Sequence, residues 1–199
     1  MKRFEVAVAS LAIAMSAFVF VPGDAFAQQR TGFYGSVNAG GLFVNDDDLD
    51  GETVSYDTGY VVSAAIGKRF GNNIRGEVEL SYGAVGLDAE GFSGGDVTMF
   101  GATVGGYYDV NLGSAFTPYL GAGTGFVHAK MDDITLDVMG IPMTFEGDST
   151  TELTLFGEVG VAYALTPDID IVPSYRFQWI DADGADTMHI VKLGLRYGF

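Results

Sequence analysis

The sequence predicts an all-β protein, an eight-stranded antiparallel transmembrane up-and-down β-barrel, and three observations carry this prediction. Apolar and polar residues alternate after residue 27, and no sustained helical period of about 3.6 residues appears. The alternating segments are 12 to 15 residues long, and a tilted strand needs only ~9–11 residues to cross the hydrocarbon of a bilayer. The connections alternate between short and long, as in antiparallel membrane barrels.

The first 27 residues are expected to be a cleaved secretory signal peptide. Lys2 and Arg3 give it a positive start, the apolar run "VAVASLAIAMSAFVFV" follows, and the small-residue motif "AFA" places the cleavage site after Ala27. We therefore expect two parts, a signal peptide over 1–27 and an outer-membrane β-barrel domain over 28–199. The chain has no cysteine, so the exported domain must be stabilised by packing or by a membrane.

The strands and their connections follow from the alternation. The predicted strands cover residues 31–44, 59–70, 74–87, 96–110, 117–130, 151–165, 169–180 and 187–199. The short turns are 71–73, 111–116 and 166–168, and the longer connections are 45–58, 88–95, 131–150 and 181–186. The short turns are expected to face the periplasm and the longer loops the outside. Pro173 lies within a predicted strand and cannot donate to the ladder, so we expect a bulge or a local break there.

One face of each predicted strand is apolar and the other is polar. In 187–199, for example, Leu193 and Leu195 alternate with Lys192 and Arg196. A soluble lipocalin-like barrel would turn the apolar face inward, whereas a membrane barrel turns it outward. The mean hydropathy is +0.23 although the formal net charge is −16, so apolar and charged residues are segregated. Phe156 is one large exception on a polar face.

Aromatic residues near the strand ends favour the membrane arrangement, because two aromatic belts are expected at the two membrane interfaces. The predicted belt on the short-turn side contains Phe33, Phe70, Tyr107, Tyr108, Phe116, Tyr119, Tyr163, Tyr197 and Phe199. The predicted belt on the other side contains Phe43, Tyr60, Tyr82, Phe126 and Trp179. The polar face is rich in Gly, Ala and Ser, and glycines in "GATVGG" and "GAGTGF" are expected to let bulky neighbours pack over them.

Charged residues on the polar faces are expected to point into the barrel. An eight-stranded barrel has an interior that side chains can fill, so the charges would pair with one another and plug it. The alternative is a narrow ion path through the same residues. The predicted interior charges are Arg69, Arg75, Glu77, Glu79, Glu158, Arg176, Lys192 and Arg196.

The outer connections are strongly acidic. Of the 24 acidic residues that follow residue 27, 18 lie in the stretches 45–58, 88–96, 130–152 and 181–186, with Lys130 as the only base. Such a surface repels phosphate, so nucleic acid is not an expected partner. It is expected to be a solvated surface that keeps the loops extended, and the alternative is that it binds divalent cations or basic partners. If cations bind, diffuse binding is expected over one tight site. Within 45–58, Asp46, Asp48, Asp50 and Gly51 match the spacing of a calcium-binding EF-hand loop, but strands instead of helices flank it.

The two histidines are not expected to be catalytic. His128 and His189 lie toward the outward ends of their strands, on the lipid-facing parity, and neither has a neighbouring serine in sequence. We expect them to be aromatic-belt neighbours or hydrogen-bonding residues near the loops. The sequence predicts no catalytic residue, no cofactor and no dedicated metal site.

The C-terminal stretch "VKLGLRYGF" resembles the assembly signal of bacterial outer-membrane barrels, and "FTPYLGAGTGFVHAK" resembles a strand of the small outer-membrane β-barrel family related to opacity proteins and surface antigens. The resemblance implies that Leu193, Leu195, Tyr197 and Phe199 form the barrel-assembly signal. It also implies outer-membrane lipid and lipopolysaccharide as surroundings, with the barrel-assembly machinery and periplasmic chaperones as partners during biogenesis. The expected role is structural or surface-interacting, with a narrow porin-like channel as the alternative.

Overall fold

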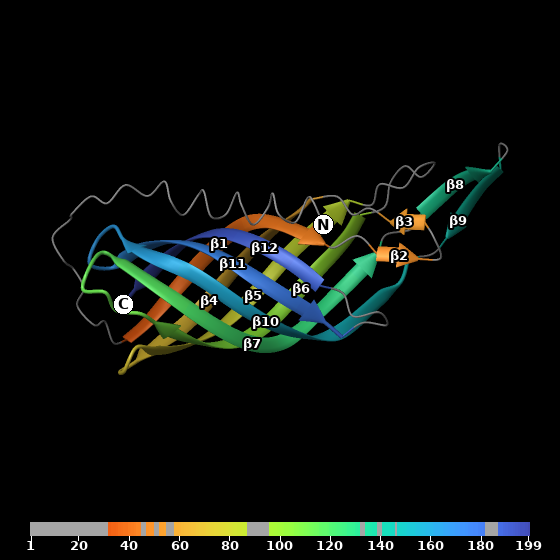
Figure 1. Cartoon of the computed structure of the whole chain (residues 1–199). Helices are drawn as coiled ribbons and strands as arrows, with labels where there is room; N and C mark the ends of the chain where they lie inside the picture. Colours follow the sequence, from red (N-terminus) through yellow and green to blue (C-terminus); the bar gives the residue numbers. More distant parts are fainter. Residues whose placement is uncertain are drawn as a thin grey trace.

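The structure is a computed structural model that describes residues 32–44, 47–49, 52–54, 58–86, 96–131, 134–138, 141–145, 147–181 and 187–199. The described strands form one closed antiparallel barrel of eight strands, in the order β1-β12-β11-β10-β7-β6-β5-β4 (Figure 1). The predicted fold class is therefore confirmed. The barrel strands are β1 Gly32–Val44, β4 Gly59–Phe70, β5 Ile74–Gly86, β6 Asp96–Asp109, β7 Phe116–Met131, β10 Ser149–Ala164, β11 Ile169–Ile180 and β12 Thr187–Gly198.

Each barrel strand begins and ends within two residues of its predicted limits. The β4–β5 turn shows why the connection can be so short. Asn72 and Asn73 both have φ of 65°, and asparagine tolerates this left-handed conformation, so the three residues 71–73 can reverse the chain. Phe70 then pairs directly with Ile74. No helix in the described ranges is long and apolar enough to cross a membrane.

The barrel has two unlike ends. β1 pairs with both β12 and β4, so Tyr34 lies opposite Gly198 and the described chain begins and ends at the same end as the three short turns. We call this the short-turn end, and Figure 1 shows the C-terminus there. The opposite end carries the longer connections, and we call it the loop end. The predicted signal peptide over 1–27 lies outside the described residues.

Two small hairpins lie at the loop end, where the sequence predicted only loops. β2 Asp47–Leu49 pairs with β3 Glu52–Val54, and β8 Ile134–Val138 pairs with β9 Ile141–Phe145. The β8–β9 hairpin continues beyond β7 and β10 and extends away from the barrel in Figure 1. Its strands were not predicted because each has only five residues. An alternation of apolar and polar residues over so short a stretch is a weak signal beside the longer alternating segments.

Pro173 breaks one ladder without shifting the register. On the β12 side it pairs with Leu193 in an uninterrupted series. On the β10 side the pairing stops between Gly160↔Ser174 and Tyr163↔Ile171, and it resumes in the same register. The expected local break is thus present, but no residue is inserted to form a bulge.

The apolar faces point outward and the charged faces inward. Leu193 on β12 is 60% exposed, whereas Arg75 on β5 is 1% exposed. Every predicted interior charge from Arg75 to Arg196 is buried, and Arg69 pairs with a carboxylate across the interior. The arrangement is that of a membrane barrel, and it is the reverse of the lipocalin-like alternative.

Two residues predicted in the short-turn aromatic belt lie inside the barrel. Tyr107 and Tyr119 are buried, so their placement at the membrane interface was wrong. Successive residues of a strand face opposite sides, and the neighbours Tyr108 and Leu120 take the outward positions. The remaining large exposed belt residues are outward as predicted. They are Phe33, Phe70, Tyr108, Tyr197 and Phe199 at the short-turn end, and Phe43, Tyr60, Tyr82 and Phe126 at the loop end.

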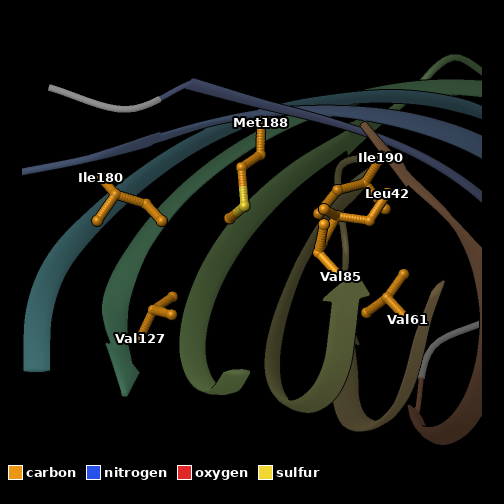
Figure 2. Packing of buried hydrophobic residues seen from close by; sticks show 7 residues of the cluster. All are labelled: Leu42, Val61, Val85, Val127, Ile180, Met188 and Ile190. Atoms are coloured by element: carbon orange, nitrogen blue, oxygen red, sulfur yellow. The ribbon is translucent and has the colours of Figure 1, made fainter. Parts of the chain in front are cut away.

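The interior of the loop end is apolar, which the sequence analysis missed. Buried side chains from six strands pack together there, and Figure 2 shows them projecting from their strands into the barrel. We call this set the apolar layer, and Met99 packs against it. The layer consists of Leu42, Val61, Val85, Val127, Ile180, Met188 and Ile190.

Candidate functional site

The middle of the barrel interior holds four buried charges, which we call the central charge cluster: Glu79, Glu158, Arg176 and Lys192. The guanidinium of Arg176 donates from Nε to Glu158 Oε2 at 2.7 Å and from Nη1 to Glu79 Oε1 at 2.5 Å. The ammonium of Lys192 donates to Glu158 Oε2 at 3.0 Å and to Glu79 Oε2 at 3.3 Å. Two cations and two carboxylates thus neutralise one another within hydrogen-bonding distance.

The central charge cluster crosses the interior. β5 and β11 lie on opposite sides of the closed barrel, and the Glu79–Arg176 ion pair joins them. Ser63 donates to Glu79 Oε2 at 3.3 Å and Tyr119 donates to Glu158 Oε1 at 2.8 Å, so both carboxylates accept further hydrogen bonds. The cluster and the apolar layer together fill successive levels of the interior, as expected for a barrel of eight strands.

A second charged group lies nearer the short-turn end and is centred on Arg75. Its guanidinium donates to Asp109 Oδ1 at 3.0 Å, to Glu77 Oε2 at 3.2 Å and to the Tyr34 hydroxyl at 3.1 Å. The Tyr34 hydroxyl in turn donates to Glu77 Oε2 at 2.7 Å. Arg75 also lies over the Tyr107 ring at 3.9 Å from its centroid, a cation–π contact in a desolvated setting.

Two more arginines approach the same end of the interior. Arg69 on β4 donates to Asp170 Oδ2 on β11 at 3.1 Å. Arg196 on β12 lies over the Tyr34 ring at 5.1 Å and the Tyr119 ring at 5.8 Å. Tyr34, whose role the sequence analysis missed, therefore contacts Arg69, Arg75 and Arg196. The signal for it was strand parity, because Phe33 beside it is outward.

Glycines make room for the interior rings. A methyl group on Gly67 would overlap the Tyr34 ring, and one on Gly121 would overlap the Tyr107 ring. Gly123 stands in the same relation to Phe156, the exceptional residue on a polar face, whose ring lies 4.1 Å from the Arg176 guanidinium carbon. The predicted packing of bulky neighbours over strand glycines is confirmed for Gly121 and Gly123, and Gly67 is a further case.

The histidines are hydrogen-bonded on the outer faces of their strands. His128 Nδ1 lies 2.8 Å from Thr151 Oγ1. His189 Nδ1 lies 2.6 Å from the Tyr175 hydroxyl, and its ring packs against Tyr175 and Phe177. These contacts confirm the expected aromatic and hydrogen-bonding surroundings.

The structure gives only the backbone of the EF-hand-like stretch. Asp48 pairs with Thr53 and Leu49 with Glu52 in the β2–β3 hairpin, and the barrel strands β1 and β4 flank it, as predicted. The side chains of 45–57 lie outside the described residues, so calcium binding in 45–58 stays a prediction. Among the side chains that are described, no three carboxylates or histidines converge as metal ligands would.

Comparison with known sequences gives two matches. The family model described as "Outer membrane protein beta-barrel domain" matches residues 6–199. Outer membrane protein PagN of Salmonella typhimurium is 38% identical over 82 residues, which cover 41% of this chain and 34% of PagN. The match thus spans about a third of the length of that curated relative.

Solved structures share the architecture. Neisserial surface protein A superposes with a TM-score of 0.62 at 22% identity, covering 84% of this chain and 97% of that one. Ail, the attachment invasion locus protein of Yersinia pestis, gives 0.51 at 17% identity in its complex with the heparin analogue sucrose octasulfate, covering 83% and 99%. At these identities the likeness concerns the fold.

Proposed function

This chain belongs to the outer membrane protein β-barrel domain family and is a bacterial outer-membrane protein, and we propose that it is a non-conducting barrel with a structural and surface-interacting role. In this proposal the filled barrel anchors the protein in the outer membrane, and the connections at the loop end engage partners outside the cell. The barrel contributes stability, and the loop end contributes recognition. The protein carries out no catalysis.

The observation that carries the proposal is the β8–β9 hairpin. Its register pairs Ile134 with Phe145, Leu136 with Met143 and Val138 with Ile141. Alternate positions of a strand share a face, so six apolar positions fall on one face of a ribbon that extends away from the barrel (Figure 1). A two-stranded ribbon is marginally stable alone in water, and a partner that covers the apolar face would stabilise it.

Charge indicates which partners the loop end would accept. The connections carry 18 acidic residues and one base in the stretches analysed above. A sulfated polyanion such as the heparin analogue bound to Ail would be repelled. We propose that the partner presents an apolar surface with a basic rim, or that divalent cations bridge it to the acidic residues. Complementary charge of this kind speeds association and excludes partners of the wrong sign.

The filled interior favours a non-conducting barrel and not a narrow channel. An ion moving along the axis would have to displace the ion pairs of the central charge cluster and then pass the apolar layer. An apolar constriction resists wetting and blocks ions. Discrete, reproducible openings of the refolded protein in planar bilayers would instead support the channel.

The C-terminal residues are suited to an assembly signal. Leu193, Leu195, Tyr197 and Phe199 are all outward and exposed at the short-turn end of β12. We propose that the barrel-assembly machinery binds this face, which the finished protein turns toward lipid. Periplasmic chaperones would hold the chain beforehand, and outer-membrane lipid and lipopolysaccharide would surround the folded barrel.

Polar substitution of the hairpin tests the surface role. Replacing both Leu136 and Met143 with serine is expected to weaken attachment of expressing bacteria to protein-coated surfaces by roughly thirtyfold, because loss of a central apolar anchor costs about 2 kcal/mol. The matched control is the double serine variant of Thr135 and Thr144, a cross-strand pair of the opposite alternation. Equal attachment by both variants, with intact folded mobility on gels, would remove the hairpin from the proposed function.

A further inference from the structure

The β8–β9 hairpin has two edges, and Pro142 makes them unlike. In an antiparallel pair of strands, residues directly opposite each other either exchange two hydrogen bonds or exchange none, and the two kinds of pair alternate. Pro142 lies opposite Asp137 and has no N–H to exchange. The Asp137↔Pro142 pair is therefore of the kind without hydrogen bonds, and so is Thr135↔Thr144, two positions away.

The backbone polar groups of these four residues point away from the hairpin. On the β8 edge, Thr135 and Asp137 each present an N–H and a C=O. On the β9 edge, Thr144 presents both groups, but Pro142 presents only a carbonyl, because proline cannot donate to a ladder. Among the described strands, none pairs with β8 or β9 except these two with each other. The edge of β8 is thus the one that offers a complete row of donors and acceptors to a further strand.

The sequence of β8 indicates which kind of strand would fit this edge. Positions 134, 136 and 138 are apolar, and positions 135 and 137 are polar, with an acidic residue at 137. In neighbouring strands, opposite charges that lie beside each other stabilise the sheet, and like charges destabilise it. A strand with a basic residue beside Asp137 is therefore favoured. A second copy of this chain, which has a formal net charge of −16, is disfavoured.

We propose that the edge of β8 is a docking site for an extended segment of a partner protein that alternates apolar and basic residues. This inference rests on the proposed surface role and adds the mode of recognition. The partner segment forms a third strand, whose backbone bonds to Thr135 and Asp137. Main-chain hydrogen bonds then supply affinity, and the alternation of side chains supplies specificity. A third strand also stabilises a hairpin that is marginal with two strands.

The test compares proline substitutions on the two edges. The probe is a short synthetic peptide that alternates lysine and valine, added to the refolded barrel in zwitterionic lipid nanodiscs. Thr135→Pro removes an outward N–H without removing a hydrogen bond to β9, and is expected to weaken peptide binding about tenfold, because a peptide carbonyl loses its donor. Thr144→Pro makes the same change directly opposite, on the β9 edge, and is expected to leave peptide binding unchanged. Equal weakening by both variants would overturn the proposal.

Amide hydrogen exchange of the unaltered protein covers the case in which Thr135→Pro disrupts the hairpin. Saturating peptide is expected to slow the exchange of the Thr135 and Asp137 amide hydrogens by at least about tenfold and to leave Thr144 unchanged. Slowing at Thr144 instead, or at none of the three, would overturn the proposal. So would slowing at Thr135 that increases with protein concentration when no peptide is present, because the occupant would then be a second copy of the chain.

Failure of this proposal and failure of the surface role give different results. Lost attachment in the double serine variant of Leu136 and Met143, together with equal peptide binding by the two proline variants, would keep the surface role and overturn the docking edge. Unchanged attachment in the double serine variant would overturn the surface role of the hairpin itself.

Discussion

Replacing Arg176 with methionine is expected to lower the free energy of unfolding by about 3–5 kcal/mol, because removal of one partner leaves an uncompensated buried charge. Arg176 is 3% exposed and joins Glu79 to Glu158. In the variant, Lys192 alone would face both carboxylates. Urea-induced unfolding of the barrel in lipid vesicles, followed by tryptophan fluorescence of the single Trp179, gives the comparison.

Two further variants identify the cause of the loss. Lys68→Met removes a cation of the outer face and is expected to leave stability almost unchanged, as exposed charges contribute little. Arg176→Met combined with Glu79→Gln restores the balance of charge in the central charge cluster and is expected to recover part of the stability. An unchanged unfolding midpoint in Arg176→Met alone would show that the cluster does not hold the interior together.

Replacing Leu80 with arginine is expected to lower the free energy of unfolding by about 2–4 kcal/mol, the cost of a basic residue near the midplane on the lipid face of a barrel. Leu80 lies in the middle of β5 and is 51% exposed. In water, such a substitution at an exposed site would usually change stability by less than about 0.5 kcal/mol. The size of the effect therefore reports whether lipid covers this face.

Leu112→Arg is the matched control. Leu112 is 60% exposed and lies in the short connection between β6 and β7, outside the strands. The same substitution there is expected to cost little, because the side chain can reach the interface. If Leu80→Arg and Leu112→Arg destabilise the barrel equally, depth in the membrane does not determine the cost, and the assignment of β5 to the hydrocarbon fails.

The sequence specified the barrel strands because their signal is repeated and local. Alternation over 12 or more residues fixed both the limits and the faces of strands such as β5 and β12. The β8–β9 hairpin was missed because five alternating residues are also common in loops. Pro173 predicted a break in the hydrogen-bond ladder of its strand, but only the structure shows that β11 keeps its register with both β10 and β12.

The interior was predictable in composition and not in pairing. Strand parity places Glu79 and Arg176 inside, yet their contact depends on the shear of the closed barrel, which brings β5 and β11 across from each other. The prediction that Tyr107 and Tyr119 lie at the membrane interface rested on their position near a strand end. The alternation of strand faces places both residues inside the barrel. The apolar layer was missed because Val85 and Met188 lie on strand faces whose other inward residues are polar. Strand parity alone therefore did not indicate that the interior becomes apolar at the loop end.

The accessibility of spin labels to oxygen and to a water-soluble reagent tests whether lipid covers the outward apolar face. The chain has no cysteine, so single cysteines at Val78, Leu80 and Leu112 can be labelled without other changes. In vesicles, labels at Val78 and Leu80 are predicted to collide often with oxygen and rarely with a water-soluble nickel complex, and a label at Leu112 to show the reverse. Equal exposure of all three labels to the nickel complex would show that water, and not lipid, covers Val78 and Leu80.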